Sequence, residues 1–407
     1  MLWNVICGKK EKREKMINSE LQTPCYIIHN DILEEGISLL KGALERDWKN
    51  SCVGYSFKTN SLPWVVEKMK QAGFYAEVVS ENEYDLACKH EFEHVIYNGP
   101  VKGKRSFLHA LEQGAIINLD AKRELDWLEE SGKKDVTVGL RINFNLEAMC
   151  PGETSGGDEG SRFGFSLETG EFVWAMERLK KMGVKLSGLH LHTSSKTRSI
   201  NIYRALAMKA CELKREFNLE LSFIDIGGGY FGGMDNRPKF PDYTKVIAEE
   251  LSKEFSMEDT MLIMEPGTSL FTPPIEYLST VVDVRKTYAN VIVTTDGSRI
   301  DIDPQYVKRG YFHEFLYQDE AEKREILEKQ VICGLTCMEN DRLFVTENTK
   351  ALQVGDRISY QKVGGYTMCL TPLFIRYFPN VYLEENGEYR LVREAWTPEE
   401  YSRKSTW

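Results

Sequence analysis

Short apolar runs alternate with amphipathic stretches of helical length between Val53 and Gly267. The eight runs are Val53–Lys58, Tyr75–Ser80, His94–Gly99, Ala115–Asp120, Thr137–Asn143, Leu186–Thr193, Leu221–Gly229 and Met261–Gly267. The helical stretches between them include Leu62–Ala72, Glu81–His90, Ser106–Gln113, Ile202–Phe217 and Tyr243–Phe255. Strands separated by helices predict βαβ units and a parallel sheet. Eight such units over about 215 residues predict a closed (β/α)8 TIM barrel, with a doubly wound open sheet as the alternative.

The pattern changes after Thr272, where apolar runs are separated by turns instead of helices. These runs include Tyr277–Val284, Asn290–Thr295, Gln330–Cys333, Arg357–Gln361 and Tyr389–Val392. Such spacing is typical of an antiparallel β domain, and the early run Thr23–His29 is expected to join it. The sequence therefore predicts a barrel over residues 38–272 and a β domain made of residues 16–37 and 273–407.

The composition agrees with a soluble globular protein of two domains. Of the 407 residues, 42% are hydrophobic and 28% are charged, and one core rarely serves a chain of this length. The net charge is −10 and no Lys/Arg-rich run occurs, which argues against nucleic acid as a partner. The segment Lys9–Lys15 mixes both signs of charge and is expected to be a solvated leader.

Signals for membranes, secretion and metals are also missing from the sequence. No apolar run approaches the roughly 20 residues that cross a bilayer. Met1–Cys7 is apolar but lacks the basic flank and the cleavage site of a signal peptide. The nine cysteines show no Cys-x-x-Cys spacing, so we expect neither a disulfide framework nor a zinc site. A cytoplasmic protein without a membrane partner fits best.

Polar residues at the ends of the barrel strands are the candidates for chemistry, because a (β/α)8 barrel places its active site there. Lys58 closes the first run. A lysine in this position can be an ordinary side chain that extends to water. A desolvated lysine at a barrel mouth would instead have a lowered pKa and could form a Schiff base.

The sixth run carries His190 and His192, which alternation places on one side of the strand. A metal pair is one interpretation, but no third ligand of fitting type recurs nearby. A histidine ring stacked on a planar cofactor is the better interpretation. A hydrogen-bonded core histidine is the third interpretation.

The seventh and eighth runs end in groups that suit an anion and a cation. Three glycines, Gly227–Gly229, permit close approach of an anion to backbone N–H groups, although such a turn can simply reverse the chain. Glu265 follows the eighth run and suits a protonated pyridine nitrogen, although a structural ion pair would explain it equally well. Together, an amine, a flat ring, a phosphate cradle and a carboxylate are what pyridoxal 5'-phosphate requires.

An ordered series of motifs resembles the fold-type III pyridoxal-phosphate decarboxylases, which share the alanine-racemase-like barrel and include diaminopimelate, ornithine/arginine and carboxynorspermidine decarboxylases. The resemblance covers nearly the whole chain. Its motifs are Thr23–Tyr26, Tyr55–Asn60, Ser80–Glu83, Tyr97–Lys102, Ser161–Gly164, His192, Asp225–Gly229, Glu265–Gly267, Cys337 with Asp341, and Gly364–Tyr366.

The resemblance implies roles for individual residues. Lys58 would bind the cofactor covalently, Glu265 would pair with the pyridine nitrogen, and His192 would stack on the ring. Arg141, Thr268 and Glu77, which stands where the family usually has Asp, would lie near the cofactor. The residues implied to contact the phosphate are Ser195, Gly228, Gly229, Gly267 and Tyr366. The family also pairs two subunits head to tail, so that Cys337 of one completes the site of the other and protonates the product; a plain buried thiol is the alternative.

Departures from the family concentrate where the substrate is read. Thr268 stands where Arg usually follows Glu-Pro-Gly, and Asp303-Pro304-Gln305-Tyr306 replaces an Arg-Pro pair before a tyrosine. Met338 and Glu339 follow the cysteine, where related enzymes carry an acid for a distal ammonium.

Two lost guanidinium groups remove the clamp for a distal carboxylate. We therefore expect decarboxylation of an amino acid other than meso-diaminopimelate, with a modified or conjugated amino acid as the candidate. Asp303 or Glu339 could supply a replacement charge, or both could be exposed and solvated. A racemase on the same barrel and a non-catalytic cofactor-binding homologue are the alternatives.

Overall fold

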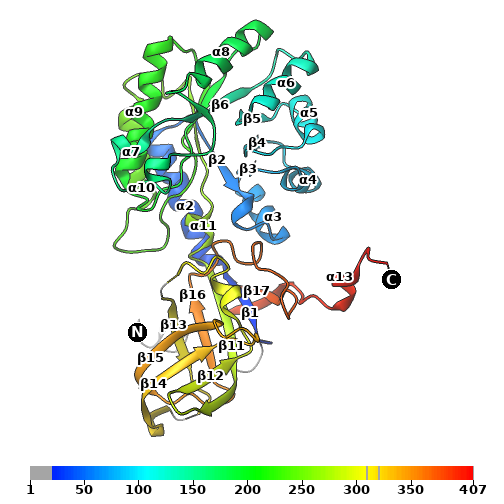
Figure 1. Ribbon diagram of the computed structural model, residues 1–407, viewed down its shortest axis with the longest axis vertical. Helices are drawn as coiled ribbons and strands as arrows, with labels where there is room; N and C mark the ends of the chain where they lie inside the picture. Colours follow the sequence, from blue (N-terminus) through cyan, green and yellow to red (C-terminus); the bar gives the residue numbers. More distant parts are fainter. Residues whose placement is uncertain (1–20, 309, 320, 407) are drawn as a thin grey trace. The chain divides into compact units, whose positions relative to one another are not determined.

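The computed structural model describes residues 21–308, 310–319 and 321–406 and divides them into two compact units (Figure 1). One unit comprises residues 35–270, and the other comprises residues 21–34 and 271–406. Met1–Cys7, the segment Lys9–Lys15 and residues 16–20 of the expected β domain lie outside the described residues.

The first unit is a closed parallel barrel of eight strands. They are β2 (Ser51–Ser56), β3 (Tyr75–Val78), β4 (Val95–Tyr97), β5 (Ile116–Leu119), β6 (Val138–Asn143), β8 (Gly188–His190), β9 (Phe223–Asp225) and β10 (Met261–Met264). The ring closes because β5 pairs with β6 and β10 pairs with β2, both in parallel. A short ninth strand, β7 (Phe165–Ser166), adds to β6. All eight strand runs predicted from the sequence are thus confirmed, and the open sheet is excluded.

Helices follow the strands around the barrel (Figure 1). They are α2 (Asn30–Asp47), α3 (Pro63–Gln71), α4 (Glu81–Lys89), α5 (Lys104–Glu112), α6 (Lys122–Ser131), α7 (Leu146–Met149), α8 (Glu171–Met182), α9 (Ile200–Phe217), α10 (Phe240–Leu251) and α11 (Thr268–Phe271). Short 3-10 turns occur at Phe57–Thr59 and Gly157–Glu159. The first strand was expected to extend through Lys58, but it ends at Ser56, so Lys58 lies in a turn beyond the strand.

The barrel interior is filled by a layer of apolar side chains that includes Ile96, Phe223 and Ile263. Two glycines make room for the Phe223 ring. A Cβ at Gly188 would lie 2.3 Å from that ring, and one at Gly139 would lie 2.9 Å from it. Because this layer packs the barrel, the polar side chains at the strand ends stand above a closed apolar floor.

The second unit is a nine-stranded sheet around the long strand β11 (Ile275–Lys286). Its other strands are β1 (Cys25–His29), β12 (Val291–Thr295), β13 (Phe312–Leu316), β14 (Ile326–Cys333), β15 (Arg342–Lys350), β16 (Arg357–Gln361), β17 (Asn380–Glu385) and β18 (Glu388–Arg393). Its short helices are α12 (Arg299–Ile302), α13 (Pro398–Ser402) and a 3-10 turn at Ala321–Lys323. The N-terminal strand β1 joins this sheet, as predicted. Most pairs are antiparallel, while β1–β17 and β12–β14 are parallel.

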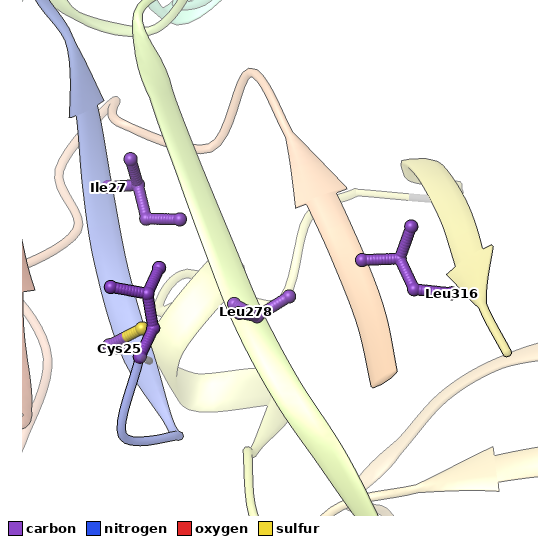
Figure 2. Close-up of a cluster of buried hydrophobic side chains, with 5 residues drawn as sticks. Cys25, Ile27, Leu278 and Leu316 are labelled. Atoms are coloured by element: carbon purple, nitrogen blue, oxygen red, sulfur yellow. The ribbon is translucent and has the colours of Figure 1, made fainter. Parts of the chain in front are cut away.

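One apolar cluster of this unit joins distant parts of the chain. Figure 2 shows Cys25 and Ile27 on β1, Leu278 on β11 and Leu316 on β13. All four side chains are buried, so the N-terminal strand is held by side-chain packing as well as by its ladder hydrogen bonds.

Among the described residues, every helix is too short or too polar to span a bilayer.

Candidate active site

The Lys58 amine lies beside a buried carboxylate. Lys58 Nζ donates to Glu77 Oε2 at 3.0 Å, and Ser56 Oγ donates to the same oxygen at 2.5 Å. The Lys58 side chain is 34% exposed, whereas the Glu77 side chain is 1% exposed. The turn after β2 therefore fixes the amine by a charge-assisted hydrogen bond and leaves it accessible from one side.

Two asparagine amides connect Glu77 with the far side of the barrel. Asn98 Nδ2 donates to Glu77 Oε1 at 3.0 Å and also to Glu265 Oε1. Asn118 Nδ2 donates to Asn98 Oδ1 at 2.8 Å and to Asp225 Oδ2 at 3.0 Å. The groups form one hydrogen-bonded network drawn from five strand ends. We did not predict the two asparagines as site residues. The signal that could have revealed them is a polar residue within or directly after an apolar strand.

Asp225 and Glu265 form a buried carboxyl pair. Burial raises the pKa of Asp225 well above its usual value, and the negative charge of Glu265 raises it further. Burial and the neighbouring carboxylate therefore both favour the protonated form of Asp225. The sequence placed Asp225 in a motif without giving it a role.

The two histidines stack above this pair. The rings of His190 and His192 are 6.1 Å apart and inclined by 14°. Burial is the main cause that lowers the pKa of both imidazoles, and the Arg141 charge adds to it. Both rings are therefore neutral at pH 7, and His192 Nδ1 accepts the Gly228 N–H at 3.0 Å.

The expectation that no third metal ligand lies near His190 was wrong. Ligand atoms of His190, Asp225 and Glu265 lie within 4.8 Å of one another. However, the side-chain amides of Asn98 and Asn118 direct their N–H groups at these carboxylates. Because the positive end of an amide dipole repels a cation, the cluster suits a hydrogen-bonded group better than a metal.

Glycines form a tight cradle after β9 and β10. A Cβ at Gly228 would lie 2.2 Å from the Glu265 carbonyl oxygen, and one at Gly267 would lie 2.1 Å from Thr59 Oγ1. Gly229 has a φ of +93°, in the left-handed region that favours glycine. The neighbouring Ser195 Oγ accepts the Arg198 N–H at 2.8 Å and donates to the Glu153 carbonyl.

Arg141 is committed to structural contacts at the barrel rim. Its guanidinium donates to Asp120 Oδ2 at 2.8 Å and to the His192 carbonyl at 3.2 Å. Burial would raise the pKa of Asp120, but Arg141 and the Gly164 N–H outweigh it, so the net pKa is lowered. The Asp120 carboxylate therefore stays charged. Arg141, bonded to it, fixes the backbone at His192, just beyond the end of β8.

The second unit holds the remaining candidates. The Cys337 thiol is exposed, which excludes a plain buried thiol within the subunit. Met338 is partly buried, and Glu339, 96% exposed, pairs with Arg342 at 3.1 Å. Tyr366 is partly buried with a φ of +65°.

The idea that Asp303 is exposed and solvated was wrong. Its side chain is 1% exposed and accepts hydrogen bonds from Arg299 at 3.0 Å and from the Lys308 N–H at 3.1 Å. The Tyr311 hydroxyl adds a third donor at 3.3 Å. The carboxylate thus holds its own loop together, and Tyr306 lies in that loop with the Arg299 guanidinium over its ring at 4.7 Å.

Comparison with known proteins agrees with this arrangement. Residues 36–272 match the family described as pyridoxal-dependent decarboxylase, pyridoxal binding domain. The diaminopimelate decarboxylase of Archaeoglobus fulgidus is 26% identical over 363 residues, which cover 85% of this chain and 84% of that protein. Mouse ornithine decarboxylase is 25% identical over 369 residues, covering 84% of this chain and 76% of that protein. The solved diaminopimelate decarboxylase of M. jannaschii is similar with a TM-score of 0.83 at 22% identity, covering 95% of this chain and 92% of that one.

Proposed function

Because this chain belongs to the pyridoxal-dependent decarboxylases, we propose that it removes the α-carboxylate of a modified or conjugated amino acid rather than of meso-diaminopimelate. The cofactor is pyridoxal 5'-phosphate and the chemistry is amino-acid decarboxylation. The observation that carries the site assignment is the network that runs from Lys58 through Glu77 and Asn98 to Glu265.

The residues at the barrel mouth fit the cofactor. Both ring nitrogens of His190 are buried without a hydrogen bond among the described residues, as expected where a ligand completes a site. The glycines after β9 and β10 let two backbone turns pack closely, since a Cβ at Gly228 would meet the Glu265 carbonyl, and this backbone cradle is the proposed phosphate site. Lys58 would hold the cofactor covalently, and Glu265 would accept a hydrogen bond from its protonated ring nitrogen.

When bound, pyridoxal phosphate supplies an electron sink for the bond between Cα and the carboxylate. Glu77 accepts a hydrogen bond from the Lys58 amine and holds it in place, and Glu265 would supply the carboxylate for the ring nitrogen. The neutral His192 offers a flat face without adding a positive charge. A proton must then replace the carboxylate at Cα, and Cys337 is the proposed donor.

The substrate proposal departs from the names of the relatives. Those similar proteins are named diaminopimelate, ornithine and arginine decarboxylases. This chain carries Thr268 and Asp303 where the family resemblance expects arginine, and Met338 where it expects an acid. Without these charges a free distal carboxylate or ammonium gains little binding energy, whereas a conjugated side chain needs neither group.

Purified protein loaded with pyridoxal phosphate tests both parts. We expect a visible absorbance band that Lys58→Ala abolishes and that Lys180→Ala, a change at an exposed lysine on α8, leaves intact. Release of CO2 is then measured with meso-diaminopimelate, ornithine, arginine and their side-chain N-conjugates. A kcat/KM that is highest for meso-diaminopimelate would refute the substrate proposal. Absorbance without CO2 from any amino acid would favour the non-catalytic alternative.

We further propose a homodimer whose sites are shared through Cys337. The exposure of this thiol on the second unit supports the proposal. Lys58→Ala and Cys337→Ala proteins, each inactive alone, are unfolded together, refolded and assayed. Shared sites predict recovered activity, because one of the two sites in a mixed dimer contains both residues. No recovery in dimers shown to have mixed would place both residues in one subunit's site.

A further inference from the structure

Arg198 lies in the turn between β8 and α9 and is fixed there by its backbone. Its φ is +51°, in the left-handed region. The Arg198 N–H donates to Ser195 Oγ at 2.8 Å, and the Arg198 carbonyl accepts from the Tyr243 hydroxyl at 2.6 Å. The side chain therefore starts from a backbone held on both sides.

The guanidinium of Arg198 has only neutral partners. Nη1 lies 3.2 Å from the Tyr230 carbonyl and 3.4 Å from Thr268 Oγ1, and the group lies over the Phe231 ring at 5.7 Å. Within residues 21–308, 310–319 and 321–406, no carboxylate lies within ion-pair distance of it. A partly buried cation without an anion is costly, so this position favours an anionic ligand.

Each partner of Arg198 adjoins the glycine cradle. Tyr230 directly follows Gly229, and Thr268 directly follows Gly267. The two loops pack against each other, because a Cβ at Gly232 would lie 1.8 Å from the Ser269 carbonyl oxygen. The guanidinium therefore stands at the edge of the cradle, where both loops meet.

We propose that Arg198 binds the phosphate of the cofactor. The inference rests on the proposed function, which puts this phosphate in the cradle. Backbone N–H groups donate hydrogen bonds to a phosphate without a full positive charge. A guanidinium adds charge-assisted bonds of about twice the strength of neutral ones.

Binding of two ligands to the apoprotein tests the proposal. Pyridoxal 5'-phosphate and pyridoxal, which lacks the phosphate, are titrated by absorbance into the unsubstituted, Arg198→Met, Arg198→Lys and Arg237→Met proteins. Arg237 is the matched control, because it also lies over Phe231, at 5.1 Å, but is exposed and bonds neither Tyr230 nor Thr268.

Arg198→Met should raise the Kd for pyridoxal phosphate on the order of 10- to 100-fold, the effect of losing a hydrogen bond to a charged group. The Kd for pyridoxal should stay unchanged, which also shows that the variant is folded. Arg198→Lys should give a smaller rise, and Arg237→Met none.

Three results would overturn the inference. Both Kd values could rise equally in Arg198→Met, which indicates a structural role. Both Kd values could stay unchanged in Arg198→Met, which would leave the cation without a role in cofactor binding. Alternatively, only the KM for substrate could rise, which would assign the cation to a substrate carboxylate. If the unsubstituted protein bound neither ligand, the proposed function would fail as well, so the two failures are distinguishable.

Discussion

The buried ion pair between Lys102 and Glu124 offers the sharpest test of how the barrel mouth is held together. Both side chains are 0% exposed, with Nζ 3.0 Å from Oε2. Lys102 also donates to the carbonyls of Gly99 and Asn118, each at 2.9 Å. These carbonyls belong to the ends of β4 and β5, next to the amides that hold the buried carboxylates. We therefore expect Lys102→Met to disturb both stability and cofactor binding.

The magnitude follows from the charge left behind. Burial lowers the pKa of Lys102 and raises that of Glu124, while their mutual attraction opposes both shifts. Removing the ammonium leaves the Glu124 carboxylate with the Asp120 N–H as its remaining donor among the described residues. Stranding a buried charge costs about 3–5 kcal/mol, which lowers Tm by roughly 10 °C in a unit of this size. Adding Glu124→Gln to Lys102→Met removes the stranded charge and should restore most of the loss.

Urea unfolding of the apoprotein at pH 7, followed by tryptophan fluorescence, gives the free energies for a double-mutant cycle. Lys104→Met is the control, because it breaks an exposed pair with Glu130, which lies on α6 as Glu124 does, and should cost at most about 1 kcal/mol. The reasoning is refuted if Lys102→Met costs no more than this control. It is also refuted if the double variant is no more stable than Lys102→Met alone.

Three further changes probe the site. Gly228→Ala places a Cβ 2.2 Å from the Glu265 carbonyl and should weaken pyridoxal-phosphate binding by about 1–3 kcal/mol; an unchanged Kd would mean that the cradle can expand. Burial raises the pKa of Glu83 from 4.5 to about 7, so its contribution to stability is present below pH 4.5 and is lost as the pH rises towards 7. Glu83→Gln, which can still accept the Val79 N–H, should flatten this dependence in unfolding curves, and a parallel pH profile would contradict it. Cys337→Ser should lower kcat by about 100-fold without changing the Kd for pyridoxal phosphate, and unaltered turnover would remove it as the proton donor.

The barrel was predictable because its signal is local. Each parallel strand is buried on both faces, so it reads as a continuous apolar run bounded by turns. The strand-end rule then selected Lys58, His190, His192 and Glu265 without knowledge of the contacts between them. The exact ends of the strands were harder to predict, since Lys58 follows β2 in a turn instead of closing the strand.

The network that joins these groups was not predictable from one sequence. Asn98 and Asn118 act by bridging carboxylates from strands distant in the chain. An isolated asparagine in an apolar run gives no indication of its partner. Asp303 shows the same limit, because its burial depends on a loop that folds back over it. Likewise, parallel pairing of β12 with β14 depends on long-range register that turn spacing does not encode.

Unsatisfied polar atoms connect stability with cofactor binding at the barrel mouth. Both nitrogens of His190, Asn118 Oδ1 and Arg141 Nε are buried without a hydrogen bond among the described residues. Each such group costs about 1–3 kcal/mol, and Arg198 adds an uncompensated charge at the rim. A ligand that meets these groups would bind the folded state and not the unfolded chain, so it would raise Tm by an amount that grows with the logarithm of its affinity. The same geometry that destabilises the empty barrel therefore favours the loaded one, and the gain in Tm with pyridoxal phosphate should shrink in Arg198→Met.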